Sequence, residues 1–81
     1  MSTEETTERV RAILARALKI DIKSIPLDAS QTNLSEWDSV RHMNVVIGLE
    51  NEFEIEFDDA ELPGLTSVPL LVAAVQKHAA G

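Results

Sequence analysis

Apolar side chains recur at helical spacing in three separate segments, and this pattern most constrains how the chain can fold. The three stripes are Val10, Ile13, Leu14, Ala17 and Leu18; Val45, Val46, Leu49 and Phe53; and Leu71, Val72 and Val75. Residues three or four positions apart share one face of a helix. A chain of 81 residues, 44% of them apolar, can bury one modest core. We therefore predict an all-α fold: a single domain over residues 1–81, built as a small bundle of three main helices plus one short helix.

Capping residues mark where these helices begin. Ser2 and Glu5 fit a capping box for the first helix. Thr66 or Ser67 is expected to cap the last helix, with Pro69 in its first turn, where a missing N–H costs little. Lys77 and His78 suit the C-terminal end of that helix because its dipole favours positive charge there.

The segments between the helices contain turn-forming residues. Residues 21–36 predict a long ordered loop, and its expected apolar anchors are Ile22, Ile25, Leu27 and Leu34. The stretch FEIEF alternates like a strand but has no partner strand, so it is interpreted as a helix end and a turn. A short helix is expected over residues 58–62, ended by Pro63 and Gly64.

The composition excludes several classes of function. There is no cysteine, which removes disulfides, thiolate metal sites and thiol catalysis. The net charge of −7 disfavours nucleic acid and favours basic patches on protein partners. Neither a transmembrane run nor a signal-peptide pattern is visible, so we expect a cytoplasmic monomer that does not bind membranes.

The junction at Asp38-Ser39 is the candidate site. A phosphate ester on Ser39 would be well placed at a helix start, where unpaired N–H groups and the positive end of the dipole point outward. Spacing alone favours a simple N-cap role for this serine. Trp37 is expected to anchor the loop, with a position at the rim of the site as the alternative.

Residues 39–53 carry a second apolar stripe made of Val40, Met43 and Ile47. An amphipathic helix needs only one buried face. The second stripe is therefore either more core or a docking surface for a partner, and the sequence leaves both open.

Catalysis and metal binding are weakly supported. Asp38, Ser39 and His42 are close in sequence, but a hydrolytic triad also needs an oxyanion hole, and the nucleophile-elbow pattern is absent. His42 and His78 lack partners at metal-ligand spacing. The acidic residues 58–61 are interpreted as a solvated turn, where a loosely bound calcium ion would not define a function. No catalytic residue and no metal ligand is predicted.

Four motifs in order resemble the acyl carrier protein family. They are Asp38-Ser39-Val40, Leu49-Glu50-Asn51-Glu52-Phe53, Asp58-Asp59 and Thr66-Ser67-Val68. The similarity runs without a gap from residue 38 to about residue 75 and more loosely over the rest. Val40 stands where leucine is usual, and Glu36-Trp37-Asp38 replaces a glycine-rich lead-in. Trp-Asp-Ser is similar to the motif of discrete, specialised carriers in lipid, polyketide or secondary metabolism, rather than of the carrier for fatty acid biosynthesis.

The resemblance implies a carrier and not an enzyme. Ser39 would receive 4′-phosphopantetheine from coenzyme A through a phosphopantetheinyl transferase, with Asp38 and Trp37 beside the cofactor. The thiol of this arm would hold an acyl group as a thioester for a loading ligase, an acyltransferase or a synthase. The docking residues would be Val40, Arg41, Met43 and Ile47. An acyl pocket would be lined by Val46, Leu49, Phe53, Leu65, Val68 and Val72.

Two alternatives remain. An aminoacyl or peptidyl carrier is the nearest, although the Gly-Gly-x-Ser motif usual in such carriers is absent. An acidic helical adaptor without a prosthetic group is the other. In an adaptor Ser39 would only cap the helix, and the stripe of Val40, Met43 and Ile47 would bind the partner.

Overall fold

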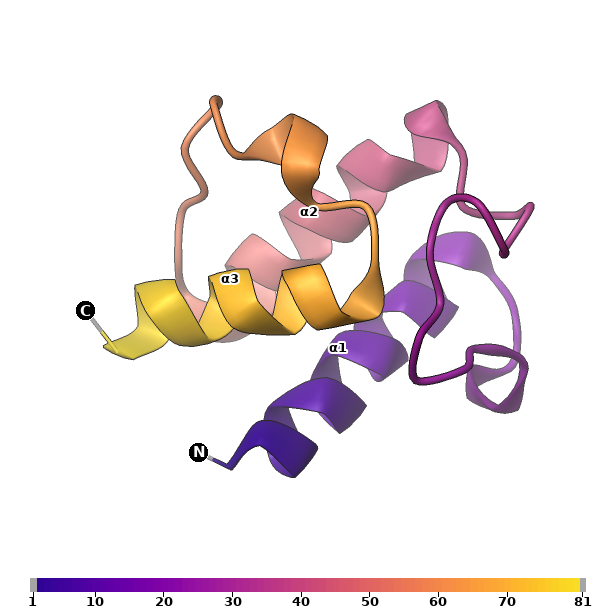
Figure 1. The fold of residues 1–81 in the computed structure, drawn as a ribbon, viewed down its shortest axis with the longest axis horizontal. Helices are drawn as coiled ribbons and strands as arrows, with labels where there is room; N and C mark the ends of the chain where they lie inside the picture. The colour runs from indigo at the N-terminus through magenta and orange to yellow at the C-terminus, as the bar shows by residue number, and fades with distance from the viewer. Residues whose placement is uncertain (1, 81) are drawn as a thin grey trace.

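The computed structural model describes residues 2–80 and confirms the all-α fold. Its α-helices are α1 (Thr3–Leu18), α2 (Ser39–Phe53) and α3 (Val68–Ala80), and its short 3-10 helices are η1 (Ile22–Ser24) and η2 (Leu62–Gly64). Helix α1 packs against both α2 and α3, and α3 crosses over the other two in Figure 1. Within residues 2–80 the only β-pairing is one isolated bridge between Ser30 and Ser67. FEIEF is thus a helix end and turn, as predicted.

Helix α1 begins and presents its apolar stripe as predicted. Ser2 Oγ accepts a hydrogen bond from the Glu5 N–H at 3.1 Å, which satisfies one N–H of the first turn. Val10, Ile13, Leu14 and Leu18 are buried, and Ala17 is half-buried beside them. The helix ends at Leu18, and its C-cap residue Lys19 adopts the left-handed conformation with φ 59°.

Gly48 sets how closely α1 and α2 approach each other. A Cβ at this position would lie 2.9 Å from Ile13 Cγ2, closer than two carbons tolerate. On the same side of α2, Arg9 Nη2 lies 2.8 Å from Glu52 Oε2, and its guanidinium stacks 4.5 Å from the centroid of the Phe53 ring. Glycine at position 48 therefore permits the close crossing that fixes the axis of α2 on α1.

The long loop is ordered, but one of its four predicted anchors is wrong. Ile25 and Leu34 are buried and Ile22 is half-buried in η1, whereas Leu27 is 63% exposed. Polar contacts hold this part of the loop instead. Arg11 donates to the Ile25 carbonyl at 2.6 and 2.9 Å and to the Ile22 carbonyl at 3.1 Å. Leu27 follows the turn that these bonds fix and points outward.

The short helix lies later in the chain than predicted. Residues 59–61 form a turn, and η2 begins only at Leu62 and contains Pro63 and Gly64. Proline does not end this helix because it stands in the first turn, where its missing N–H has no intrahelical partner. The prediction treated Pro63 as a stop signal, although its position makes it part of the start.

Ser67 caps α3, which settles the choice between Thr66 and Ser67. Ser67 Oγ accepts a hydrogen bond from the Leu70 N–H at 3.3 Å, whereas the Thr66 carbonyl accepts from the Gln31 N–H at 3.0 Å. The Val68 N–H donates to the Ala29 carbonyl at 2.8 Å. The long loop is thereby fastened to the start of α3, and Leu71, Val72 and Val75 enter the core as predicted.

Candidate functional site at the start of α2

Asp38, and not Ser39, caps α2. Asp38 is in the extended conformation, and its Oδ1 accepts a hydrogen bond from the Arg41 N–H at 2.8 Å. Ser39 is the first residue of the helix proper. The interpretation of Ser39 as the N-cap is therefore wrong, because a capping side chain must precede the first helical residue to reach the N–H groups of the first turn.

The Ser39 side chain has no structural task in the described chain. Ser39 is exposed, and among residues 2–80 its hydroxyl makes no hydrogen bond. Figure 1 shows the long loop running into α2, the helix that begins at Ser39. The start of α2 thus presents an exposed hydroxyl that has no hydrogen-bond partner within residues 2–80.

One cation accompanies the carboxylate beside Ser39. Arg41 Nη1 lies 3.1 Å from Asp38 Oδ2 and 3.3 Å from the Glu36 carbonyl oxygen. Both partners of the ion pair are about half exposed, so the pair adds little to stability. Its effect is local: it offsets the negative charge of Asp38 next to a hydroxyl that could receive a phosphate.

Trp37 is a core anchor and not a rim residue. Its side chain is 1% exposed, and its backbone N–H donates to the Leu34 carbonyl at 3.0 Å. Its indole Nε1 donates to His42 Nδ1 at 3.0 Å, with the ring centroids 5.9 Å apart. The expectation that Trp37 lies beside the cofactor loses its support, because the ring fills the space under the loop. Sequence reasoning missed its bond to His42.

The hydrolytic arrangement does not form. His42 Nδ1 is engaged by Trp37, and His42 Nε2 is buried with no hydrogen-bond partner among the described residues. Ser39 and His42 make no hydrogen bond to each other in residues 2–80. A serine cannot be activated by an imidazole that does not contact it.

The second stripe of α2 lies on the surface. Val40 is 79% exposed, Met43 49% and Ile47 50%, whereas Val45, Val46 and Leu49 on the other side of the helix are buried. The alternative that the stripe is core is wrong. Three exposed apolar side chains therefore line α2 from the residue that follows Ser39 onward.

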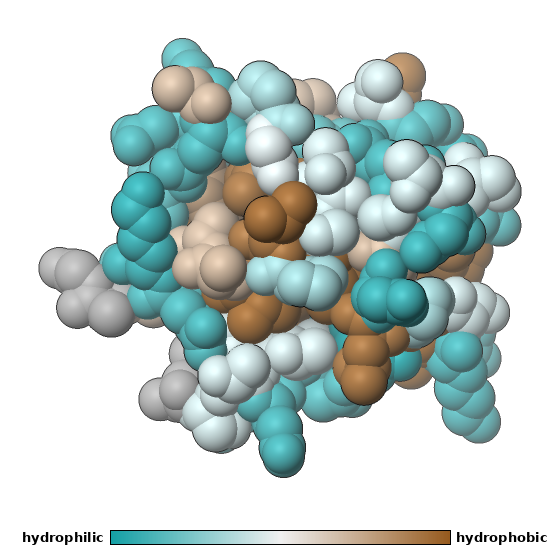
Figure 2. All heavy atoms as spheres, viewed as in Figure 1, coloured by the Kyte–Doolittle hydropathy of each residue, from teal (hydrophilic) through white to brown (hydrophobic). Residues whose placement is uncertain are grey.

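The six residues proposed for an acyl pocket all join one core cluster. Val46, Leu49, Leu65, Val68 and Val72 are buried and Phe53 is partly buried against them. Figure 2 shows apolar atoms reaching the surface between the η2 segment and α3, on a face that is otherwise largely polar. A surface hollow of about 440 Å³ lies between α1 and α2, and none of the six residues lines it.

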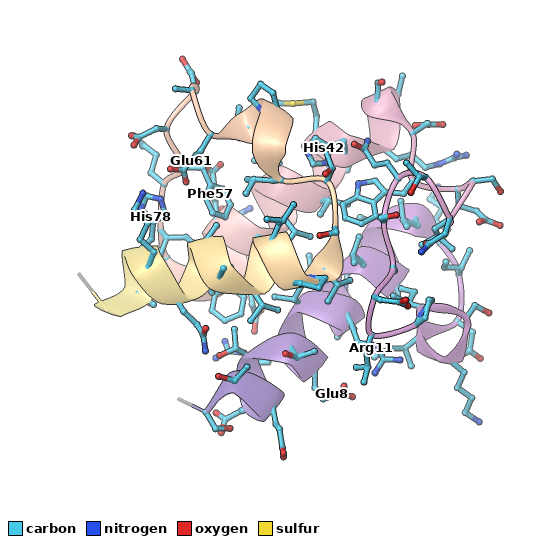
Figure 3. The ribbon with its side chains drawn as sticks, in the orientation of Figure 1. Glu8, Arg11, His42, Phe57, Glu61 and His78 are labelled. Atoms are coloured by element: carbon cyan, nitrogen blue, oxygen red, sulfur yellow. The ribbon has the colours of Figure 1, made fainter. Side chains whose placement is uncertain are left out.

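The acidic turn is tied to α3 and is only partly solvated. Glu61 Oε1 lies 2.6 Å from His78 Nε2, and Glu61 Oε2 lies 3.8 Å from Lys77 Nζ. The Phe57 ring meets the His78 ring edge to face at 5.4 Å (Figure 3). Asp58 and Asp59 are exposed as expected.

In residues 2–80 no three His, Asp or Glu side chains gather as metal ligands, and no helix is long and apolar enough to cross a membrane.

Comparisons with known proteins identify the family. The family model described as "Phosphopantetheine attachment site" matches residues 8–75. The acyl carrier protein of Petrotoga mobilis is 31% identical over 68 residues, which are 84% of this chain and 80% of that protein. The solution structure of the holo acyl carrier protein of Geobacter metallireducens superposes with a TM-score of 0.81 at 29% identity, covering 93% of this chain and 86% of that one.

A further solved structure is similar to this protein over nearly the whole length of both chains. A chain in the structure of the ishigamide ketosynthase/chain length factor has a TM-score of 0.74 and 30% identity, with 95% of this chain and 97% of that chain covered. The helix order, the exposed serine at the start of α2 and these similarities agree. The chain belongs to the acyl carrier protein family, whose prosthetic group is 4′-phosphopantetheine.

Proposed function

We propose that Ser39 is the residue that carries 4′-phosphopantetheine. Two observations at the helix start support this. Asp38 makes the capping bond, and the exposed Ser39 hydroxyl has no hydrogen-bond partner in residues 2–80. A serine that served only the fold would be expected to make that bond itself.

The chemistry of attachment needs little from this chain. Ser39 Oγ bonds to the phosphorus that bears the pantetheine arm of coenzyme A, and the P–O bond to the nucleotide phosphate breaks. The nucleotide 3′,5′-ADP leaves, and a base of the transferase takes the hydroxyl proton. Arg41 and the first-turn N–H groups of α2 favour the resulting phosphodiester anion.

The bound group supplies a thiol that holds an acyl chain as a thioester, which this cysteine-free chain cannot supply itself. The protein holds and presents the acyl group, and catalyses nothing. The core residues between α2, the η2 segment and α3 are the proposed lining for that group, since apolar atoms reach the surface there (Figure 2). Opening of the packed core would have to precede entry of a chain.

The partner enzymes are proposed to dock along α2. Val40, Met43 and Ile47 offer exposed apolar surface, and Arg41 adds a positive charge beside Ser39. A phosphopantetheinyl transferase must reach this edge first. Loading ligases, acyltransferases and synthases would follow, in keeping with the neighbour found with a ketosynthase/chain length factor.

Intact mass spectrometry tests the attachment. Treatment with coenzyme A, magnesium and a broad-specificity transferase is expected to add one phosphopantetheine, and peptide mapping is expected to place it on Ser39. Ser35→Ala is the control variant, because Ser35 is another exposed serine, in the preceding loop. It should be modified like the wild type. No mass increase with several transferases, on folded and initially unmodified protein, would favour the adaptor without a prosthetic group.

Charge reversal at Arg41 is expected to change the choice of partner without unfolding the protein. Glutamate at the third helical position suits the positive end of the dipole, so the free energy of unfolding should change by less than about 0.5 kcal/mol. Rates with partners whose docking patch is basic should rise, and rates with acidic patches should fall. Lys23→Glu, an exposed charge reversal in η1, is the control. Equal changes with every partner enzyme would contradict the docking proposal.

A further inference from the structure

A side-chain hydrogen bond joins Trp37 and His42, the residues that flank Asp38 and Ser39 in the chain. Trp37 Nε1, from the end of the loop, lies 3.0 Å from Nδ1 of His42, in the early part of α2. Trp37 is 1% exposed and cannot swing out without emptying part of the core. The bond therefore joins the loop to the helix directly across the proposed attachment point (His42 is labelled in Figure 3).

The chemistry of the donor fixes the protonation state of His42. An indole N–H can only donate, so Nδ1 must be the imidazole nitrogen without a proton. His42 is then neutral, with its proton on Nε2, an atom that is buried and has no hydrogen-bond partner in residues 2–80. A second proton would place an N–H on Nδ1 facing the Trp37 N–H. Two donors cannot bond to each other, so protonation of His42 ends this contact.

We propose that His42 is a positioning residue for the modification of Ser39, because its bond from Trp37 holds residues 37–39 in the arrangement that the transferase meets. This inference rests on the proposed function of Ser39. His42 acts through Trp37 and does not itself touch coenzyme A. Loss of the Nδ1 acceptor releases the Trp37 indole and makes Ser39 a poorer acceptor.

The charged groups that neighbour Trp37 and His42 along the chain are already partnered. From the same loop and helix, Asp38 pairs with Arg41 at 3.1 Å and Arg41 also binds the Glu36 carbonyl. His42 makes no ion pair in residues 2–80. The bond from Trp37 is thus the contact that depends on its protonation.

Two substitutions at His42 test its role as the hydrogen-bond acceptor for Trp37. Asparagine can present its Oδ1 near the position of Nδ1 and cannot be protonated, whereas leucine removes the acceptor. We would measure kcat/KM for modification at pH 8. Each variant is compared with the wild type using one transferase, so the properties of the transferase cancel in the ratio.

His42→Leu is expected to lower kcat/KM about two- to tenfold at pH 8, the factor that one net hydrogen bond contributes. His42→Asn should recover most of that rate. His78→Asn, which changes the other histidine, should keep the rate of the wild type.

Two spectroscopic readouts do not depend on the transferase. The 15N resonances of His42 in the wild type should show Nδ1 without a proton and Nε2 with one at neutral pH. The emission of Trp37, the single tryptophan, should shift in His42→Leu and stay close to that of the wild type in His42→Asn. Circular dichroism checks that each variant is folded.

A proton on Nδ1 at neutral pH, or a folded His42→Leu variant that is modified at the rate of the wild type, would overturn the positioning role. The 15N test stands even where His42→Leu fails to fold. A wild type that accepts no phosphopantetheine at any pH would instead refute the proposed function of Ser39, so the two failures can be told apart.

Discussion

Ser39→Ala is expected to abolish modification completely while leaving the stability of the fold almost unchanged. The hydroxyl makes no hydrogen bond in residues 2–80 and the side chain is exposed, so its removal breaks no contact. Alanine is also favourable at the first position of a helix. We expect no mass increase with coenzyme A and transferase, and a change in the free energy of unfolding within about 0.5 kcal/mol. Intact mass and urea unfolding followed by Trp37 fluorescence measure the two quantities.

Asp38→Ala is the matched variant, because it removes the capping bond from the neighbouring position. Loss of an N-cap costs about 0.5–2 kcal/mol, and the ion pair with Arg41 is lost as well. The stability cost should therefore fall on Asp38 and not on Ser39. An equal loss of stability in both variants would contradict the assignment of the cap, and a mass increase in Ser39→Ala would contradict the assignment of the attachment point.

Local signals were enough to predict the helices. The helix predicted over residues 39–53 has the same range as α2, because apolar side chains keep helical spacing up to Phe53 and a turn follows. The Ser2 cap and the three inner residues of α3 were predicted for the same reason. Each of these features depends on residues within one turn of each other, so no knowledge of the tertiary fold was needed.

The features that sequence reasoning missed depend on which segments meet. The two stripes of α2 have equivalent spacing, and only the packing of α1 and α3 against one side decides that Val40, Met43 and Ile47 stay exposed. Leu27 is exposed because Arg11 of α1 fixes the neighbouring carbonyls. The choice of Asp38 over Ser39 as cap turns on a one-residue difference in where the helix begins, which periodicity does not resolve.

The contact between Trp37 and His42 was difficult to predict from the sequence. A tryptophan before a helix start and a histidine five residues later could meet only if the loop folds the indole back under the first turn. That path is set by the bonds of the loop to α3 and to Leu34, which no local pattern indicates. His42 was considered as a base or a ligand, and its role as an acceptor for a buried donor became visible only in the fold.

Trp37→Ala is expected to cost about 3–5 kcal/mol of the free energy of unfolding, the range for a buried aromatic side chain cut back to alanine. The side chain is 1% exposed, and its loss also leaves His42 Nδ1 without its donor. A small domain has only about 5–15 kcal/mol of stability in total, so this one change would remove a large share of it. Urea unfolding followed by circular dichroism is the appropriate measurement, because the variant lacks the fluorescent residue.

Trp37→Phe separates the two contributions of this side chain. Phenylalanine keeps most of the buried ring but has no N–H, so it should cost less than alanine and leave His42 without its donor. A loss below about 1 kcal/mol in Trp37→Ala would contradict the role of Trp37 as a core anchor, since only an exposed side chain is expected to contribute so little. A large loss in Trp37→Ala with a small one in Trp37→Phe would instead show that filling the core under the loop is the main role of the ring. The platform for Ser39 would then depend chiefly on packing, with the hydrogen bond to His42 setting its finer geometry.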